Sequence, residues 1–122
     1  GTKRAAREAT GPDLPLHNWK LTGDWARTPQ YIKADKAGAE LTLHYKARKV
    51  FLVMDSEDGK PVNVTITANG QPTQTVDVQS GRASVDVSRL YDLLETDAVE
   101  EGVITITADR PGLRLYAFTF ES

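Results

Sequence analysis

The stretch AELTLHYKA, residues 39–47, carries an apolar side chain at every second position and a polar one between them. Successive side chains of a β-strand point to opposite faces, so this spacing predicts a strand with one buried face and one wet face. The same alternation recurs in three later segments, which are residues 62–68, 83–87 and 104–108. We therefore predict an all-β fold.

The run from Val50 to Met54 differs, because its apolar residues occupy both parities. Such a run is typical of a central strand covered on both faces, and we place it at the heart of the core. Further strands are predicted at residues 19–25, 31–34, 73–78 and 113–120. With turn signals such as Asn69-Gly70 between them, the chain has about nine or ten strands, which indicates a β-sandwich or jelly roll.

One segment departs from alternation, since apolar side chains recur at three and four residues in Leu90, Leu93 and Leu94. This spacing predicts a single helical turn from Ser88 to Leu94, capped by the serine. The acidic segment 97–102 that follows is assigned to no strand.

The first fifteen residues are expected to be an N-terminal tail or linker, and residues 16–122 the β-sandwich module. Residues 2–10 offer no apolar face to bury, and Gly11, Pro12 and Pro15 interrupt the chain. The chain starts at Gly1, and its single methionine lies inside an apolar run. We therefore expect an excised piece of a longer protein or a processed product.

Composition excludes several classes of function. The 122 residues include 15 Lys and Arg and 17 Asp and Glu, and a net charge of -2 gives no attraction to nucleic acid or to anionic membranes. No apolar run approaches the roughly 18 residues needed to cross a bilayer. The absence of cysteine excludes disulfides, thiolate metal sites and thiol chemistry within this segment. We expect one monomeric domain without cofactor, metal, nucleic-acid partner or membrane insertion.

Carbohydrate recognition requires flat aromatic faces and planar hydrogen-bonding groups. The chain offers both in six candidate ligand-binding residues: Trp25, Tyr31, Arg48, Arg89, Tyr91 and Asp92. Among the rings, Trp25 and Tyr91 are predicted to be the better exposed. We expect four other rings to pack in the core or at its edge, namely Trp19, Tyr45, Phe118 and Phe120.

Each charged candidate also has a structural interpretation. Arg48 either faces a ligand or forms a buried bidentate pair with a carboxylate such as Asp92, and the pairing is favoured. The same choice applies to Arg89.

Other polar residues are expected to be structural or solvated. Asp55, Glu57 and Asp58 carry oxygen ligands for a hard cation, but Gly59 comes one place too early for a D-x-D-x-D-G loop, which favours a solvated hairpin. His17 and His44 are expected on the surface. The nearest acid pair for hydrolysis is Asp77 with Asp86, and cross-strand acids on a wet face explain it. We expect no catalysis by this segment.

Three groups of residues are more specific than alternation. They are Trp19-x-Leu21-x-Gly23-x-Trp25, Tyr45-x-Ala47-Arg48-x-Val50-x-Leu52-Val53, and Arg89-Leu90-Tyr91-x-Leu93 together with Leu115-Tyr116-Ala117-Phe118-Thr119-Phe120. In this order they resemble the C-terminal domain of DipZ-type and related thioredoxin-like proteins, from about Leu16 to Phe120. This domain is similar to carbohydrate-binding and galactose-binding modules. The chain departs from the usual Phe-Thr-Phe-Gly ending, having Glu121 and Ser122 after Phe120.

The resemblance implies a jelly roll that follows a thioredoxin-like domain in the bacterial periplasm or cell envelope. It implies that redox-active cysteines lie in that preceding domain and that no catalytic residue lies here. The leading hypothesis is a non-catalytic accessory module that recognises a glycan or another polar ligand, or helps to place the redox domain near its substrate. The alternative is a protein-docking module that packs against the thioredoxin-like domain and has no sugar site.

Overall fold

A computed structural model describes residues 6–122, and in that range it is all-β, with ten strands and no helix. Accordingly, the described residues include no helix capable of spanning a membrane. The strands are β1 (Arg7–Glu8), β2 (Asn18–Thr22), β3 (Trp25–Arg27), β4 (Ile32–Ala34), β5 (Glu40–Ser56), β6 (Val62–Ala68), β7 (Gln71–Pro72), β8 (Arg82–Val85), β9 (Arg89–Ala108) and β10 (Leu113–Glu121).

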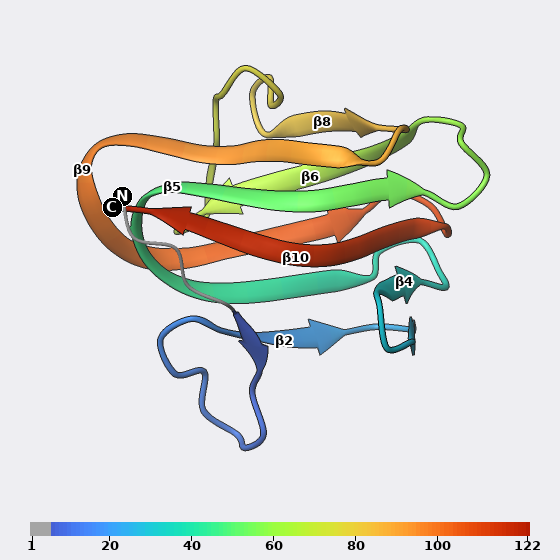
Figure 1. Ribbon diagram of the computed structural model, residues 1–122, viewed down its shortest axis with the longest axis horizontal. Coiled ribbons are helices and arrows are strands. Elements are labelled where there is room, and N and C mark those ends of the chain that lie inside the picture. The colour runs from blue at the N-terminus through green and yellow to red at the C-terminus, as the bar shows by residue number, and fades with distance from the viewer. Residues whose placement is uncertain (1–5) are drawn as a thin grey trace.

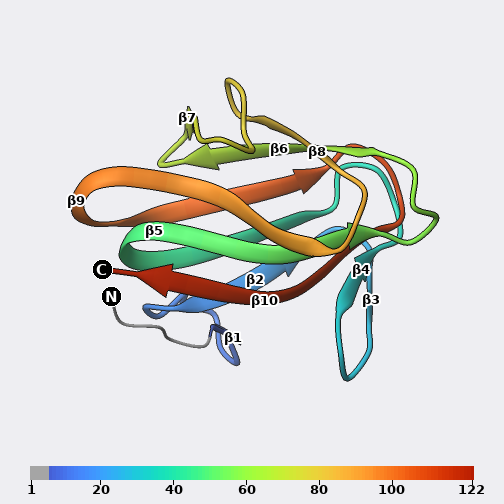
Figure 2. The same ribbon diagram turned by 45° about the horizontal axis from the view of Figure 1, so that its top comes forward.

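Two long antiparallel strands organise the fold. β5 has 17 residues and β9 has 20, and they pair from Glu40 with Thr107 to Met54 with Arg89. Both strands turn back on themselves at one end of the molecule (Figures 1 and 2), where the register breaks between Ala47 and Lys49. The predicted strands at 39–47 and 50–54 are therefore two halves of one bent strand.

Because of the bend, one half of β5 and one half of β9 lie in each of the two layers. The first layer joins β2, the first half of β5, the second half of β9 and β6, with β1 added beside β2, and β7 and β8 beside β6. The second layer joins β3, β4, β10, the second half of β5 and the first half of β9. The two layers enclose one hydrophobic core, so the fold is a jelly-roll β-sandwich as predicted.

The core contains most of the apolar side chains that alternation assigns to it, but Val87 lies beyond the end of β8 and is 61% exposed. In β5 the buried positions run through Leu41, Leu43, Tyr45, Ala47, Val50, Leu52 and Met54. Phe51 and Val53 lie on the opposite face and are half-buried. The strand is thus fully covered on one side only, unlike the prediction for residues 50–54.

The predicted helical turn at 88–94 is wrong, because these residues begin β9. Leu52 pairs with Tyr91 and Phe51 with Asp92, but Val50 pairs with Leu94, which leaves Leu93 as an extra residue in a β-bulge. The bulge buries both Leu93 and Leu94 and interrupts the alternation. The spacing of Leu90, Leu93 and Leu94 around this bulge therefore resembles the period of a helix.

Two other segments also differ from expectation. Residues 97–102, which were assigned to no strand, lie within β9 at its bend. Residues 73–78 form no strand and instead cap the edge of β9. There the Thr75 hydroxyl donates to the Asp92 carbonyl at 2.6 Å, and the Asp92 amide donates to Asp77 at 2.7 Å. Side-chain groups thus replace the ladder partner that an edge strand lacks.

The N-terminal region is partly ordered. Within the expected tail, Arg7–Glu8 pair in parallel with β2, and the Ala9 amide donates to the Trp19 carbonyl at 2.8 Å. Residues 1–5 of that tail lie outside the described residues. The predicted opening strand is divided at Gly23, where φ is +89°, into β2 and β3.

Candidate ligand-binding site

A groove of about 270 Å³ lies between the edges of the two layers, where β1 and β2 approach β3, β4 and β10. We call it the flank groove. Five buried side chains of the core line its base: Ile32, Leu41, Leu52, Leu115 and Phe118. Its more exposed lining includes Glu8, Trp19, Arg27, Gln30, Tyr31 and Tyr116. The groove thus has an apolar base and an aromatic and polar rim.

An ion pair joins the two layers at this rim. Arg27 on β3 donates to both carboxylate oxygens of Glu8 on β1, from Nε at 3.2 Å and from Nη2 at 2.5 Å. The hydrogen bonds to Glu8 raise the pKa of Arg27. With side chains 55% and 37% exposed, the pair adds at most about 1 kcal/mol of stability. Its main effect is to orient two planar polar groups and to leave the rim formally neutral.

The turn between β3 and β4 positions Tyr31. The Thr28 hydroxyl accepts hydrogen bonds from the amides of Gln30, at 3.2 Å, and Tyr31, at 3.0 Å. The Thr28 amide donates to the Tyr31 carbonyl at 2.9 Å. Threonine side chains favour such local turns, so this short loop presents Tyr31 from a fixed backbone.

A second tyrosine stands beside Tyr31, and a buried carboxylate anchors it. The Tyr31 and Tyr116 ring centroids lie 5.5 Å apart, and the Tyr116 hydroxyl donates to Asp55 Oδ2 at 3.0 Å. Arg114 binds the same carboxylate through two hydrogen bonds, and its guanidinium carbon lies 5.1 Å from the Tyr31 ring centroid. Burial, then the hydrogen bond to Asp55, raises the pKa of Tyr116. The aromatic side of the groove is therefore preorganised.

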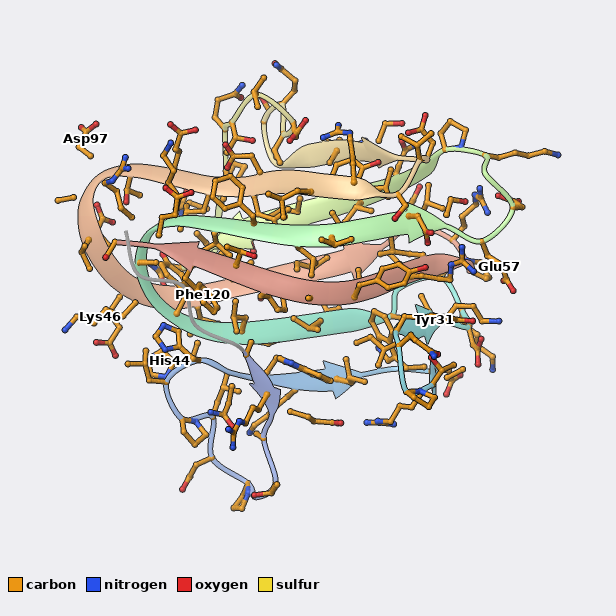
Figure 3. The ribbon with its side chains drawn as sticks, viewed as in Figure 1. Tyr31, His44, Lys46, Glu57, Asp97 and Phe120 are labelled. Atoms are coloured by element: carbon orange, nitrogen blue, oxygen red, sulfur yellow. The ribbon has the colours of Figure 1, made fainter. Side chains whose placement is uncertain are left out.

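Of the six predicted ligand-binding residues, Tyr31 lines the flank groove. Trp25 lies in an adjoining hollow of about 430 Å³, which we call the Trp25 hollow and which also contains Leu21, Gly23, Asp24, Arg27, Asp35 and Lys36. Trp25 is half-buried, and its indole N–H donates to the Thr22 carbonyl at 3.1 Å. In Figure 3, Tyr31 lies near β4 at the opposite end of the molecule from His44 and Lys46.

The prediction that Tyr91 is exposed is wrong. Its side chain is 0% exposed, because residue 91 faces the core opposite Leu52. Its hydroxyl donates to the Val87 carbonyl at 2.7 Å and accepts from the Asp86 amide at 3.3 Å. The guanidinium of Arg89 covers the ring at 3.9 Å, so no ligand can stack there.

The remaining three candidates lie outside the flank groove. Arg89 pairs with Asp77 at 2.9 Å, which agrees with its structural interpretation. Burial and the neighbouring Glu95 carboxylate raise the pKa of Asp92 to about 7. Arg48 is half-buried at the bend of β5 and helps to lower the pKa of Glu95, after Asp92 and Lys49. The predicted pair between Arg48 and Asp92 is therefore not formed among the described residues.

Of the three acidic residues predicted in a solvated hairpin, Asp55 instead lies near the end of β5, whereas Glu57 and Asp58 are exposed as predicted. Asp55 is only 7% exposed and is bound by Arg114, while Glu57 pairs with Lys33 at 3.3 Å. Asp58 accepts from the Lys60 amide and the Ser56 hydroxyl, and these hydrogen bonds lower its pKa to about 2. Across residues 6–122, no three His, Cys, Asp or Glu side chains gather to hold a metal ion.

The two histidines have partners instead of lying free on the surface. His44 contacts Glu101 through Nε2 at 2.7 Å and the Leu14 carbonyl through Nδ1 at 2.9 Å. His17 packs against Phe120 with ring centroids 4.6 Å apart. Tyr45, Phe118 and Phe120 are buried and Trp19 is half-buried, as predicted.

Asp77 and Asp86, which are the nearest acid pair for hydrolysis in the sequence, each make separate structural contacts. Asp77 accepts from Arg89 and from the Asp92 amide, and these bonds outweigh burial and lower its pKa. Asp86 Oδ1 accepts from the Val87 amide at 2.7 Å. Neither carboxylate lines the flank groove.

Sequence reasoning missed five of the groove residues, which are Glu8, Trp19, Arg27, Gln30 and Tyr116. Glu8 was assigned to the tail and Trp19 to packing alone, while Arg27 and Gln30 fall between the strands predicted at 19–25 and 31–34. One signal was available at Tyr116, because residues 115–118 are apolar at both parities. The register of β10 against β5 breaks between Leu115 and Phe118, and this bulge places Tyr116 at the rim.

Residues 2–120 match the family model described as "Thioredoxin like C-terminal domain". The chain belongs to this family. The family description agrees with the resemblance drawn from the three residue groups, and it covers nearly the whole chain. Among curated proteins, no sequence matches the chain.

The fold of this family member is similar to part of a family two carbohydrate esterase from Cellvibrio japonicus. The TM-score is 0.71 and the identity 12%, over 98% of this chain. The chain spans only 32% of the length of the esterase, and at this identity the likeness concerns the fold alone.

Two carbohydrate-binding modules are more distant in structure. A family 6 module has a TM-score of 0.43 at 14% identity, over 83% of this chain and 81% of the module. CsCBM6-3 from Clostridium stercorarium, solved in complex with cellobiose, has a TM-score of 0.44 at 13% identity, over 99% of this chain and 93% of that one.

Proposed function

We propose that this domain is a non-catalytic accessory module that binds carbohydrate in the flank groove. The observation that carries the proposal is the paired Tyr31 and Tyr116 rings, 5.5 Å apart, beside the Arg27–Glu8 ion pair in one groove. A sugar ring has an apolar face that packs on an aromatic ring and hydroxyls that hydrogen-bond to planar polar groups. The flank groove supplies both kinds of contact.

The charge and size of the groove support the same ligand class. Arg27 and Glu8 balance each other, so the rim favours hydroxyl groups over a net charge. The volume of about 270 Å³ lies just below the lower end of pockets for drug-sized ligands, about 300 to 1,000 Å³. That space suits a single sugar ring seated against the rim better than a large buried ligand.

We further propose that the module follows a thioredoxin-like domain in a protein of the bacterial periplasm or cell envelope. In that setting, carbohydrate binding would hold the redox domain near the cell wall or near glycosylated substrates. The family description supports the C-terminal position. The alternative proposal is docking onto the thioredoxin-like domain without any sugar.

The test is isothermal titration of the domain with neutral cello- and chitooligosaccharides. We expect binding that Tyr31→Ala weakens at least tenfold and that Tyr31→Phe retains. Val87→Ala is the matched control, because Val87 is 61% exposed and lies outside the groove. Absence of binding to both series, or equal binding by wild type and Tyr31→Ala, would overturn the proposal and favour docking.

A further inference from the structure

The flank groove and the Trp25 hollow share one residue, Arg27, which lines both. The hollow, at about 430 Å³, is the larger of the two. Since this one residue lines both spaces, they adjoin along the edge of the second layer.

The edge strand β3 sets the order of groups along this edge. Trp25 pairs with Ala34 and Arg27 with Ile32, so both side chains lie on the same face of the strand. Residues two apart in a strand are separated by about 7 Å. Beyond the turn at Thr28, Tyr31 lines the flank groove together with Arg27. Arg27 thus lies between the Tyr31 ring, with which it shares the groove, and the Trp25 ring, with which it shares the hollow.

The Trp25 ring is held before any ligand arrives. Its indole N–H donates to the Thr22 carbonyl, and its side chain packs against the hydrophobic core while also lining the hollow. The preceding turn is tight, because Gly23 has φ +89° and a Cβ at that position would lie 3.2 Å from Ala39 Cα. A ring fixed in this way loses little conformational entropy on binding.

Acidic side chains along the flank have basic partners. Lys36 pairs with Asp24 at 3.2 Å in the hollow, as Arg27 pairs with Glu8 in the groove. The third acidic residue of the two spaces, Asp35, contacts Lys33 at 3.9 Å. Such a lining of paired charges does not attract an anionic ligand, and it offers oriented donors and acceptors.

We infer that the flank groove and the Trp25 hollow are adjoining subsites of one binding track for a neutral, linear oligosaccharide. Tyr31 contacts one sugar residue, Trp25 contacts another, and Arg27 lies between them. This inference rests on the proposed carbohydrate binding and adds the length and charge of the ligand.

The test is titration with members of the cello- and chitooligosaccharide series of one, two and four sugar residues. We expect the tetrasaccharide to bind at least tenfold more tightly than the monosaccharide. Trp25→Ala should abolish that gain, whereas Tyr31→Ala should weaken the binding of every length. Trp25→Phe, which keeps a ring, should restore part of the gain, and circular dichroism checks the fold of each variant.

The outcomes separate the two proposals. Equal affinity for all lengths, or a Trp25→Ala variant that behaves as wild type, overturns the extended track while carbohydrate binding stands. Tighter binding of oligogalacturonate than of the neutral series overturns the assignment of a neutral ligand. Absence of binding to every sugar overturns both proposals.

Discussion

Arg114 on β10 donates two hydrogen bonds to Asp55 on the neighbouring strand β5, from Nε at 2.7 Å and from Nη2 at 2.9 Å. Asp55 is 7% exposed, so this pair places a charge in a poorly hydrated site where both partners are needed. The Tyr116 hydroxyl binds the same carboxylate. The ion pair therefore links the sheet to the aromatic side of the flank groove.

Arg114→Ala should lower the free energy of unfolding by about 2 kcal/mol, because it leaves the Asp55 carboxylate buried with only one tyrosine donor. Urea denaturation at neutral pH measures the change. The control is Arg27→Ala, which removes an exposed ion pair and should cost less than about 1 kcal/mol. Equal losses for the two variants would contradict the role given to burial.

His44 should make stability depend on pH. The hydrogen bond to Glu101, followed by that to the Leu14 carbonyl, raises the pKa of His44 above 6.5. A raised folded-state pKa means that the contribution is fully present below the unfolded value and is lost as pH rises through the folded one. We expect His44→Gln to be less stable than wild type below pH 6 by about 1 kcal/mol, and the difference to shrink above pH 8.

Thermal melts of both proteins across this range, with Glu101→Gln as a companion variant, provide the measurement. Both substitutions remove the same ion pair, so both should reduce the pH dependence of the melting temperature over the same pH range. The interpretation fails if His44→Gln shows an unchanged difference from wild type at every pH.

Asp92→Asn should stabilise the domain at neutral and alkaline pH. Burial and the neighbouring Glu95 raise the pKa of Asp92 to about 7, so the folded state resists ionising a group that the unfolded chain ionises near 3.8. Wild-type stability should therefore fall as pH rises between these values. The neutral amide avoids this penalty, and a gain on the order of 1 kcal/mol is expected at pH 8.

Asp77→Asn is the opposite case, because hydrogen bonds from Arg89 and the Asp92 amide hold the pKa of Asp77 below its usual value. That variant should be less stable than wild type at pH 7. Chemical denaturation of both variants at pH 4 and pH 8 distinguishes the two effects. A loss of stability in Asp92→Asn at pH 8 would show that the carboxylate is needed in its ionised form.

Gly81→Ala should destabilise the domain more than Gly70→Ala. Both glycines have φ +79°, so alanine is strained at either position. At Gly81, however, a Cβ would also lie 2.8 Å from Pro72 Cβ and 3.1 Å from the Ile66 carbonyl oxygen, whereas nothing lies within 4 Å at Gly70. We expect about 1 kcal/mol for Gly70→Ala and at least about twice that for Gly81→Ala. Equal melting temperatures would refute the steric argument.

The sequence allowed the β-sandwich to be predicted because alternation is local. Leu41, Leu43 and Tyr45 point to one face whatever the rest of the chain does. The same reasoning failed at Leu93, where a bulge places one extra residue in β9 and disrupts the period. It also failed to join the two halves of β5, because the bend at Ala47 changes the layer without ending the strand.

By itself, the sequence determined the buried face of the alternating runs at 39–47, 62–68 and 104–108, where most strands run and that no thiol chemistry occurs in this segment. The tertiary structure alone decided that Glu8, Arg27, Tyr31 and Tyr116 border one groove and that Tyr91 is enclosed in the core. Strand alternation depends only on neighbours in the chain. The groove instead forms where the edges of two layers meet, and that meeting depends on two long strands bending at the same place.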